Sequence, residues 1–278
     1  MMKRVLITGK NSYSGKKFME RLFEVKPDWV VESISVRNND WMNEDFSRYD
    51  AIYHVAAIVH QKEDVSRENE YYRVNSELPL KLALKAKTEG VRSFVFLSSI
   101  AVYGIVGEIK STKGITKETT KDPQTLNGKS KLLAERNLKE LNDDEFKVSL
   151  LRVPLIYGEN SPGNYSSLLK LSKMLPIFPK VNNTRSMIHI DRLSDIVMHL
   201  IDSELQGVFL VNDQKNINTS LLFKALRTQQ KKKTYLSKLL GKCILTFGKE
   251  IPLIKKLFGS MYFDLKDTKI PGFEEEKI

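Results

Sequence analysis

Short apolar runs alternate with segments of helical periodicity through residues 1–200, and this order constrains the fold more than any other feature. Short apolar runs are typical of strands buried on both faces of a sheet. They are RVLIT (4–8), VVESISV (30–36), AIYHVAA (51–57), SFVFLSS (93–99) and KVSLLRVP (147–154). Helical spacing occurs at residues 12–23, after Asn75 and at residues 129–141. Because parallel strands need long crossovers, these β-α-β units predict a doubly wound parallel sheet of the α/β class.

The regular alternation ends near residue 159. We therefore expect a dinucleotide-binding domain over residues 1–158, to which residues 185–200 return. Residues 159–184 and 201–278 are assigned to a smaller C-terminal substrate-binding lobe with a basic tail.

Composition places the chain among ordinary globular proteins, with 41% hydrophobic and 28% charged residues. The longest apolar runs are shorter than the roughly 20 residues of a membrane-spanning helix. The first residues lead directly into a strand and carry no signal-peptide pattern. The single cysteine, Cys243, excludes an internal disulfide. These features predict a cytoplasmic protein.

Net charge is +11, and lysines concentrate near the C-terminus, where Glu250 is the one acid between Gln229 and Phe258. The charge suggests an anionic partner. Nucleic acid is not expected, because no zinc-finger, helix-turn-helix or aromatic RNA-binding signature accompanies the lysines. Leucines and phenylalanines are interleaved with these lysines, which suits either peripheral contact with an anionic membrane or a helix pair with solvated lysines. We prefer the second interpretation.

The loop after the first strand has the form of a phosphate-binding turn. Gly9 and Gly15 occupy the places of the first and last glycines of a Rossmann-type fingerprint, and Ser12 replaces the middle one. A serine there can cap the following helix, whose N-terminus would face a pyrophosphate. An ordinary strand-loop-helix turn is the alternative. The predicted contacts are Gly9, Asn11, Ser12, Tyr13, Ser14 and Gly15.

The second strand is followed by Arg37 instead of the acid that usually contacts the ribose of NAD. An arginine can meet a 2′-phosphate, which favours NADP slightly over NAD. Asp40 is a candidate for the role of the acid, and a solvated loop arginine is the simplest alternative.

Further segments resemble the extended short-chain dehydrogenase/reductase family. They are HVAAIVH (54–60), Asn75 in YYRVNSELPL, SSIAVYG (98–104), GKSKLLAE (128–135), LRVPLIYG (151–158) and TRSMIHIDRLSDIV (184–197). Together with the phosphate loop they cover about residues 1–200 in the family's order. The resemblance implies that Ser99 orients a sugar hydroxyl and that Lys131 holds the nicotinamide ribose. It also places Ala56, Ala57 and Pro154 along the cofactor.

Within that family, the segment PGNY (162–165), Arg185 and the basic tail look most like capsule or O-antigen UDP-sugar 4-epimerases and 4-keto reductases. The resemblance implies a role in surface polysaccharide synthesis, with Asn164 and Arg185 on the UDP-sugar. Dehydratases usually carry an acidic pair beside the serine, whereas Ile100 and Ala101 follow Ser99, so dehydration is least expected. The resemblance also implies a homodimer built on helices at residues 78–87 and 129–141.

The chain departs from the family at its catalytic tyrosine. That tyrosine should lie four residues before Lys131, where this sequence has Asn127. An amide cannot exchange a proton near neutral pH as a tyrosine held beside a lysine can. Tyr103 is one candidate substitute acid/base. The alternatives are a catalytically impaired NAD(P)-binding module, either a pseudoenzyme or a sensor, and an altered copy of an active enzyme.

The histidines do not suggest a metal or hydrolase site. His189 and Asp191 are interpreted as structural, and His54 as a core histidine. His60 and His199 lack carboxylates or cysteines at ligand spacing, so no metal is expected.

Overall fold

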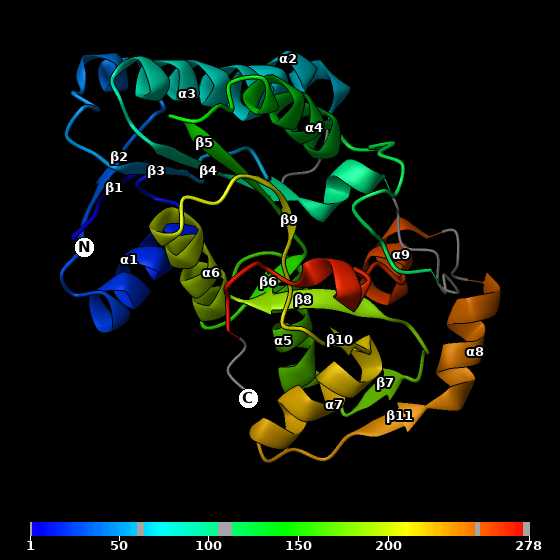
Figure 1. Ribbon diagram of the computed structural model, residues 1–278. Helices are drawn as coiled ribbons and strands as arrows, with labels where there is room; N and C mark the ends of the chain where they lie inside the picture. Colours follow the sequence, from blue (N-terminus) through cyan, green and yellow to red (C-terminus); the bar gives the residue numbers. More distant parts are fainter. Residues whose placement is uncertain (1, 60–63, 105–112, 248–250, 275–278) are drawn as a thin grey trace.

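The computed structural model describes residues 2–59, 64–104, 113–247 and 251–274. Within them, six parallel strands form the main sheet in the order β2-β1-β3-β4-β5-β9 (Figure 1). They are β1 (Arg4–Thr8), β2 (Val30–Ile34), β3 (Ala51–His54), β4 (Ser93–Ser99), β5 (Lys147–Val153) and β9 (Gly207–Leu210). The predicted doubly wound parallel sheet is confirmed.

Helices cover both faces of this sheet, because successive side chains of each strand point to opposite sides. On one face lie α1 (Tyr13–Val25) and α6 (Ile190–Asp202) (Figure 1). On the other lie α2 (Glu68–Tyr72), the π-helical turn η3 (Arg73–Glu77), α3 (Leu78–Thr88) and α4 (Leu126–Lys139). Val5 and Ile7 pack toward the first group and Leu6 toward the second, so both faces are apolar.

The smaller lobe contains two short sheets and four helices among its described residues. The sheets are β10-β8-β6 and β11-β7, from β6 (Leu155–Tyr157), β7 (Ile177–Pro179), β8 (Arg185–His189), β10 (Asn216–Ile217) and β11 (Tyr235–Ser237). The helices are α5 (Asn164–Met174), α7 (Thr219–Gln229), α8 (Lys238–Phe247) and α9 (Pro252–Phe258). Short 3₁₀ turns are η1 (Asp40–Asn43), η2 (Val65–Arg67), η4 (Ile100–Tyr103) and η5 (Leu265–Thr268).

Three elements do not follow the division expected from the sequence. β6 lies within residues 1–158, which are assigned to the dinucleotide-binding domain, yet it pairs with β8 in a sheet of the smaller lobe. β9 lies in the segment 201–278 that was assigned to the lobe, yet it pairs with β5 in the main sheet. β8 begins the segment expected to return to the first domain, but it pairs with β6 and β10, and only α6 packs against α1. Strand partners depend on contacts between distant segments, which local periodicity does not encode.

Hydrogen bonds to the backbone fix the end of one strand and the start of one helix beside the site. β3 ends at His54 because Val55 and Ala56 both donate their backbone N–H to Thr8 O. α4 begins at Leu126, three residues earlier than expected, because Thr125 Oγ1 accepts a hydrogen bond from Gly128 N at 3.0 Å.

Candidate functional site

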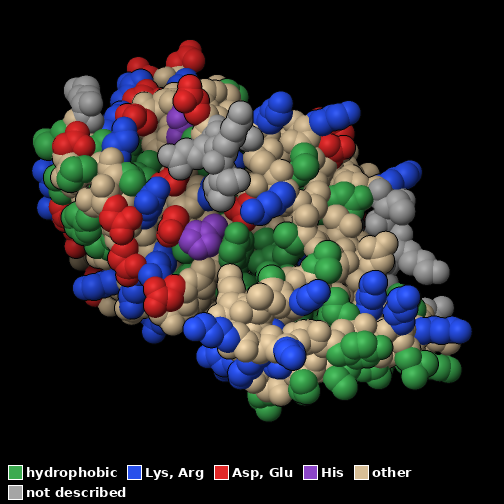
Figure 2. Space-filling model, turned by 90° about the horizontal axis from the view of Figure 1, so that it is seen from below, with side chains coloured by type: hydrophobic (Ala, Val, Ile, Leu, Met, Phe, Trp, Pro, Cys, Tyr) green, Lys and Arg blue, Asp and Glu red, His purple; other side chains and the backbone are tan. Residues whose placement is uncertain are grey.

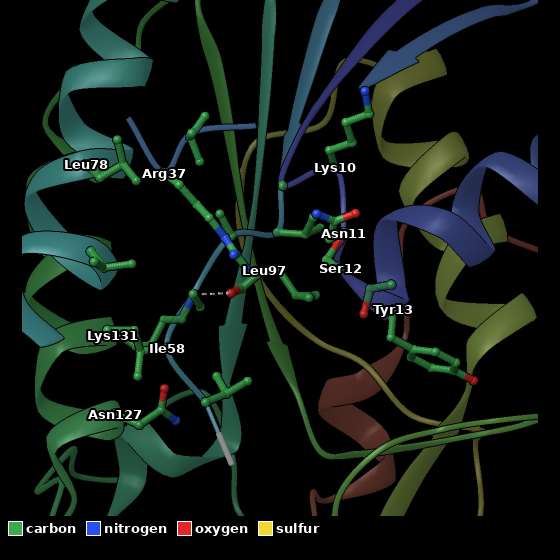
Figure 3. Close-up of a pocket in the computed structure, with 18 of the residues that line it drawn as sticks. Lys10, Asn11, Ser12, Tyr13, Arg37, Ile58, Leu78, Leu97, Asn127 and Lys131 are labelled. Atoms are coloured by element: carbon green, nitrogen blue, oxygen red, sulfur yellow. Dashed lines mark hydrogen bonds between the residues drawn. The ribbon is translucent and has the colours of Figure 1, made fainter. Parts of the chain in front are cut away.

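A cleft of about 980 Å³ opens at the carboxyl ends of the main-sheet strands (Figure 3). The loops after β1, β2 and β3 form one side, α3 and α4 form another, and the segment after β5 closes it. In open doubly wound sheets this edge is where ligands bind.

The loop after β1 has the geometry of a phosphate turn. Gly9 has a φ of +129°, and a Cβ there would lie 2.9 Å from Ala56 N, so the turn requires glycine. Ser12 Oγ caps α1 by accepting a hydrogen bond from Gly15 N at 3.0 Å. The amino end of α1 therefore faces the cleft beside Asn11 and Tyr13 (Figure 3). Gly15 does not line the cleft, but a side chain there would meet Ser12 Oγ at 2.6 Å.

The described lining is strongly cationic. Its basic residues are Lys10, Arg37, Arg67, Arg73, Lys81 and Lys131. Glu70 is the one acidic residue among the described lining residues, and it is paired with Arg67 at 2.8 Å. Arg37 extends from the loop after β2 into the cleft (Figure 3). This excess of positive charge fits a ligand with two or more phosphates.

The sequence motifs do not identify four of these cations: Lys10, Arg67, Arg73 and Lys81. Arg73, Leu78 and Lys81 lie on the cleft side of one continuous helical segment. Their spacing of five and three residues is the signal that could have identified this wall, because the π-helical turn adds one residue to the usual spacing.

Lys131 and Asn127 lie one helical turn apart on α4, and both line the cleft (Figure 3). Lys131 is 3% exposed; its Nζ donates to Leu97 O at 2.7 Å and lies 4.3 Å from the centre of the Phe96 ring. Burial lowers the pKa of this amine to about 7, and Glu135 opposes that shift. Ser99 also lines the cleft, and its Oγ accepts a hydrogen bond from Ala101 N at 3.1 Å.

Asn75 connects two segments that line the cleft, the loop after β3 and helix α4. It is fully buried; Oδ1 accepts from Ile58 N at 2.8 Å, and Nδ2 donates to Ile58 O at 3.1 Å and to Ser130 Oγ at 3.2 Å. The side chain thus ties the loop after β3 to the helix that carries Lys131.

Replacing Asn75 with alanine should lower the free energy of unfolding by about 2–4 kcal/mol, since Ile58 loses both partners and Ser130 loses one. Urea denaturation followed by circular dichroism measures the change. The exposed Asn69→Ala on α2 is the control and should change stability by less than about 0.5 kcal/mol. Equal midpoints for the two variants would contradict a clamping role.

His54 is a core histidine, as expected. It is fully buried, and its Nδ1 lies 2.7 Å from Thr8 Oγ1. Burial, with a smaller contribution from the charge of Lys131, lowers the pKa of the imidazole to about 3. The ring is therefore neutral at physiological pH, and it stacks on Phe96, the ring beneath Lys131.

Tyr103 lies away from the cleft lining, so the structure does not support it as the substitute acid/base. It is 2% exposed, and its hydroxyl accepts a hydrogen bond from Arg152 Nη1 at 2.7 Å. Arg152 forms a buried ion pair with Glu135 at 2.5 Å. Burial raises the pKa of the Tyr103 hydroxyl, although Arg152 partly opposes this. Tyr103 follows Ser99 closely in the sequence, which suggested that both side chains reach the same site. The 3₁₀ turn η4 lies between them, and only Ser99 lines the cleft.

The two substrate residues expected from resemblance also lie outside the cleft lining. Asn164 is the first residue of α5. The Arg185 guanidinium donates to the carbonyls of Lys256 and Leu257, so α9 already satisfies it. Their substrate roles stay predictions, and engaging Arg185 would require movement of α9.

The other expected positions are placed as follows. Ser14, Ala56, Ala57 and Pro154 line the cleft. Asp40 does not, and its carboxylate accepts from Asn38 Nδ2.

Among the described residues, no group of three His, Cys, Asp or Glu side chains could hold a metal ion. His189 caps α6 by accepting from Asp191 N, as befits a structural pair, and His60 lies outside the described residues. None of the helices in the described ranges combines the length and apolar character needed to cross a bilayer.

Fold and cleft together define a Rossmann-type protein built to bind a dinucleotide. Residues 5–211 match the model of the NAD dependent epimerase/dehydratase family. The chain belongs to that family.

Named relatives agree with this assignment. A UDP-glucose 4-epimerase of Vibrio cholerae is 29% identical over 97% of this chain and 89% of its own length. The N-acetyl-alpha-D-glucosaminyl-diphospho-ditrans,octacis-undecaprenol 4-epimerase of Escherichia coli O157:H7 is 24% identical, over 84% of this chain and 74% of its own. The structure of a UDP-N-acetylglucosamine 4-epimerase from Methanobrevibacter ruminantium M1 superposes with a TM-score of 0.74 at 19% identity, covering 99% and 94% of the two chains.

Proposed function

We propose that this protein uses a nicotinamide dinucleotide to oxidise or reduce C4 of a UDP-sugar, as a 4-epimerase or a 4-keto reductase. The observation that carries the proposal is a cationic cleft in which the phosphate turn, Ser99 and Lys131 share one lining. A relative that aligns with 97% of this chain and over 89% of its own length is a UDP-glucose 4-epimerase, which favours this substrate class.

Two incubations test the proposal by proton NMR. One contains UDP-glucose, UDP-N-acetylglucosamine or their 4-epimers with NAD or NADP, and the other contains a UDP-4-keto sugar with NADH or NADPH. The expected result is interconversion of one pair, or reduction of a 4-keto sugar by NADH or NADPH. Failure to bind either dinucleotide in calorimetry would overturn it.

The chain's own residues suit the cofactor. The turn from Gly9 to Ser14 would hold the pyrophosphate, and Ala56 and Ala57 would flank the adenosine. When bound, the nicotinamide ring accepts and returns the hydride of C4.

We propose NADP as the preferred form, with Arg37 at the 2′-phosphate. Arg37→Ser should weaken NADPH binding about tenfold and leave NADH binding within about twofold, because only NADPH carries the phosphate that the guanidinium pairs. Calorimetric titration of both dinucleotides measures the ratio. Lys10→Ala is the control and should weaken the binding of NADPH and NADH equally if Lys10 contacts the pyrophosphate. If Arg37→Ser also weakens the binding of both dinucleotides equally, the preference for NADP is contradicted and NAD is favoured.

For the proton, we propose Lys131 as the acid/base in the absence of a tyrosine at position 127. A buried amine with a pKa of about 7 is neutral in about half of the molecules at neutral pH and can accept the proton of the C4 hydroxyl. Ser99 would orient that hydroxyl. Because Lys131 Nζ is already bonded to Leu97 O, it reaches the sugar less readily than a tyrosine would, and slow turnover is expected.

The second candidate function is a catalytically impaired NAD(P)-binding module, and Asn127 is the observation that favours it. Such a protein would bind the dinucleotide and the UDP-sugar with no exchange at C4 in the NMR assay.

We also propose a homodimer formed through α3 and α4. Leu84 on α3 is 46% exposed and Leu133 on α4 is 38% exposed, so each helix presents an apolar residue on its outer side. Burying them between two copies would form a four-helix interface.

A further inference from the structure

The lobe carries the chain's excess of positive charge. Residues 160–190 and 214–249 contain no Asp or Glu. The basic residues of these two segments are Lys170, Lys173, Lys180, Arg185, Lys215, Lys224, Arg227, Lys231, Lys232, Lys233, Lys238, Lys242 and Lys249. Arg185 and Arg227 are bonded inside the lobe, whereas lysines such as Lys170, Lys173 and Lys238 are exposed. No carboxylate of these two segments is present to neutralise them.

Large apolar side chains are exposed within the same two segments. Tyr235 is 66% exposed and stands beside Ile177, 49% exposed, because β11 and β7 pair in that register. The chain continues from β11 directly into α8, where Leu239 is 72% and Phe247 is 82% exposed. Figure 2 shows hydrophobic side chains gathered toward the lower right of this view, with Lys and Arg side chains around them.

Helix α8 separates its two faces clearly. Its inner side packs on the lobe core through Ile244 and Leu245, and Gly241 is pressed so closely against the Lys180 backbone that no Cβ would fit. The outward residues are Lys238, Leu239, Leu240, Lys242, Cys243, Thr246 and Phe247. A fixed helix that presents apolar and basic side chains together is suited to the boundary between lipid headgroups and acyl chains.

We propose that this face of the lobe, formed by β7, β11 and α8, docks on an anionic lipid bilayer. Anionic headgroups would balance the lysines while the exposed leucine and aromatic side chains enter the interface. Each lysine near such a surface strengthens binding about fivefold. A nucleic acid would match the charge but offers no apolar phase for Leu239 and Phe247, so the observations favour lipid.

Flotation of the full chain with vesicles tests the proposal directly. We expect binding to phosphatidylcholine vesicles that contain phosphatidylglycerol, weaker binding at high salt, and no binding to phosphatidylcholine alone. Equal binding to both vesicles, or to neither, would overturn the proposal. So would tight binding to a polynucleotide by a protein that ignores vesicles.

The charge requirement is tested with Lys238→Glu/Lys242→Glu. This pair should reduce partitioning at least tenfold, because two attractive charges become repulsive. Lys16→Glu/Lys139→Glu changes the net charge equally on exposed positions of α1 and α4 and should retain most of the binding. Equal losses in both pairs would show that only overall charge matters and would overturn a defined docking face.

The apolar requirement is tested with Leu239→Ser/Phe247→Ser, against Phe23→Ser/Val65→Ser as controls of similar exposure outside the lobe. The first pair should weaken vesicle binding about tenfold, and the second should not. Light scattering of each variant completes the test. If the first pair instead dissociates an oligomer and leaves vesicle binding unchanged, the face is an interface between copies of this chain and the proposal fails. Thermal melting verifies that all variants remain folded.

Discussion

Asn127→Tyr is expected to raise turnover of the UDP-sugar by about a hundredfold or more. Positioned general acid–base groups contribute about 10²–10⁴ to a rate. A phenol at this position would extend into the cleft one turn before Lys131, whose charge would lower the pKa of its hydroxyl. The cleft of about 980 Å³ leaves space for the larger ring. The measurement is kcat by NMR or a coupled assay with saturating sugar and cofactor.

Asn127→Phe is the matched control, because it adds the same ring without the hydroxyl. It should show no gain, and its dinucleotide affinity should equal that of Asn127→Tyr within about threefold. Equal rates in the two variants would show that position 127 has no proton-transfer role. A silent wild-type protein and an active Asn127→Tyr would establish the impaired-module alternative.

Lys131→Arg is expected to reduce turnover by about 10²–10³ while dinucleotide binding falls far less. Arginine keeps the positive charge, but its pKa is too high for it to accept a proton near neutral pH. The wild-type rate of sugar oxidation should rise with pH through about 7, because the amine of Lys131 must be neutral to act as the base. Below that pH the protonated amine predominates and the rate should fall.

The pH profile separates a chemical role from a structural one. In Lys131→Arg the inflection near pH 7 should disappear, whereas a merely structural loss would lower the rate and leave the inflection in place. Lys129→Arg, at the exposed position two residues earlier on α4, should preserve both the rate and the profile. A residual inflection near pH 7 in Lys131→Arg would assign the acid/base to another group.

Local sequence patterns were sufficient to predict the structure of segments whose conformation depends on residues only a few positions apart. β4 matches its predicted bounds, and the phosphate turn has the expected cap because Ser12 and Gly15 lie within the same turn. The helix that carries Asn127 and Lys131 also follows from local spacing, although its start depends on the Thr125 cap. Asn75 could be singled out, but its bonds to Ile58 and Ser130 could not be read from the sequence.

The sequence by itself therefore determined the parallel α/β sheet, the phosphate turn and the spacing of Asn127 and Lys131, because apolar periodicity, glycine and capping residues act within a few positions. Only the tertiary structure decided that β9 joins the main sheet, that Tyr103 is bonded to Arg152, and that Arg73 and Lys81 line the same cleft as the phosphate turn. These outcomes depend on burial and on contacts between segments far apart in the chain. Such contacts also bury Lys131 and lower its pKa to about 7, whereas a lysine in a solvated peptide keeps its ordinary, higher pKa.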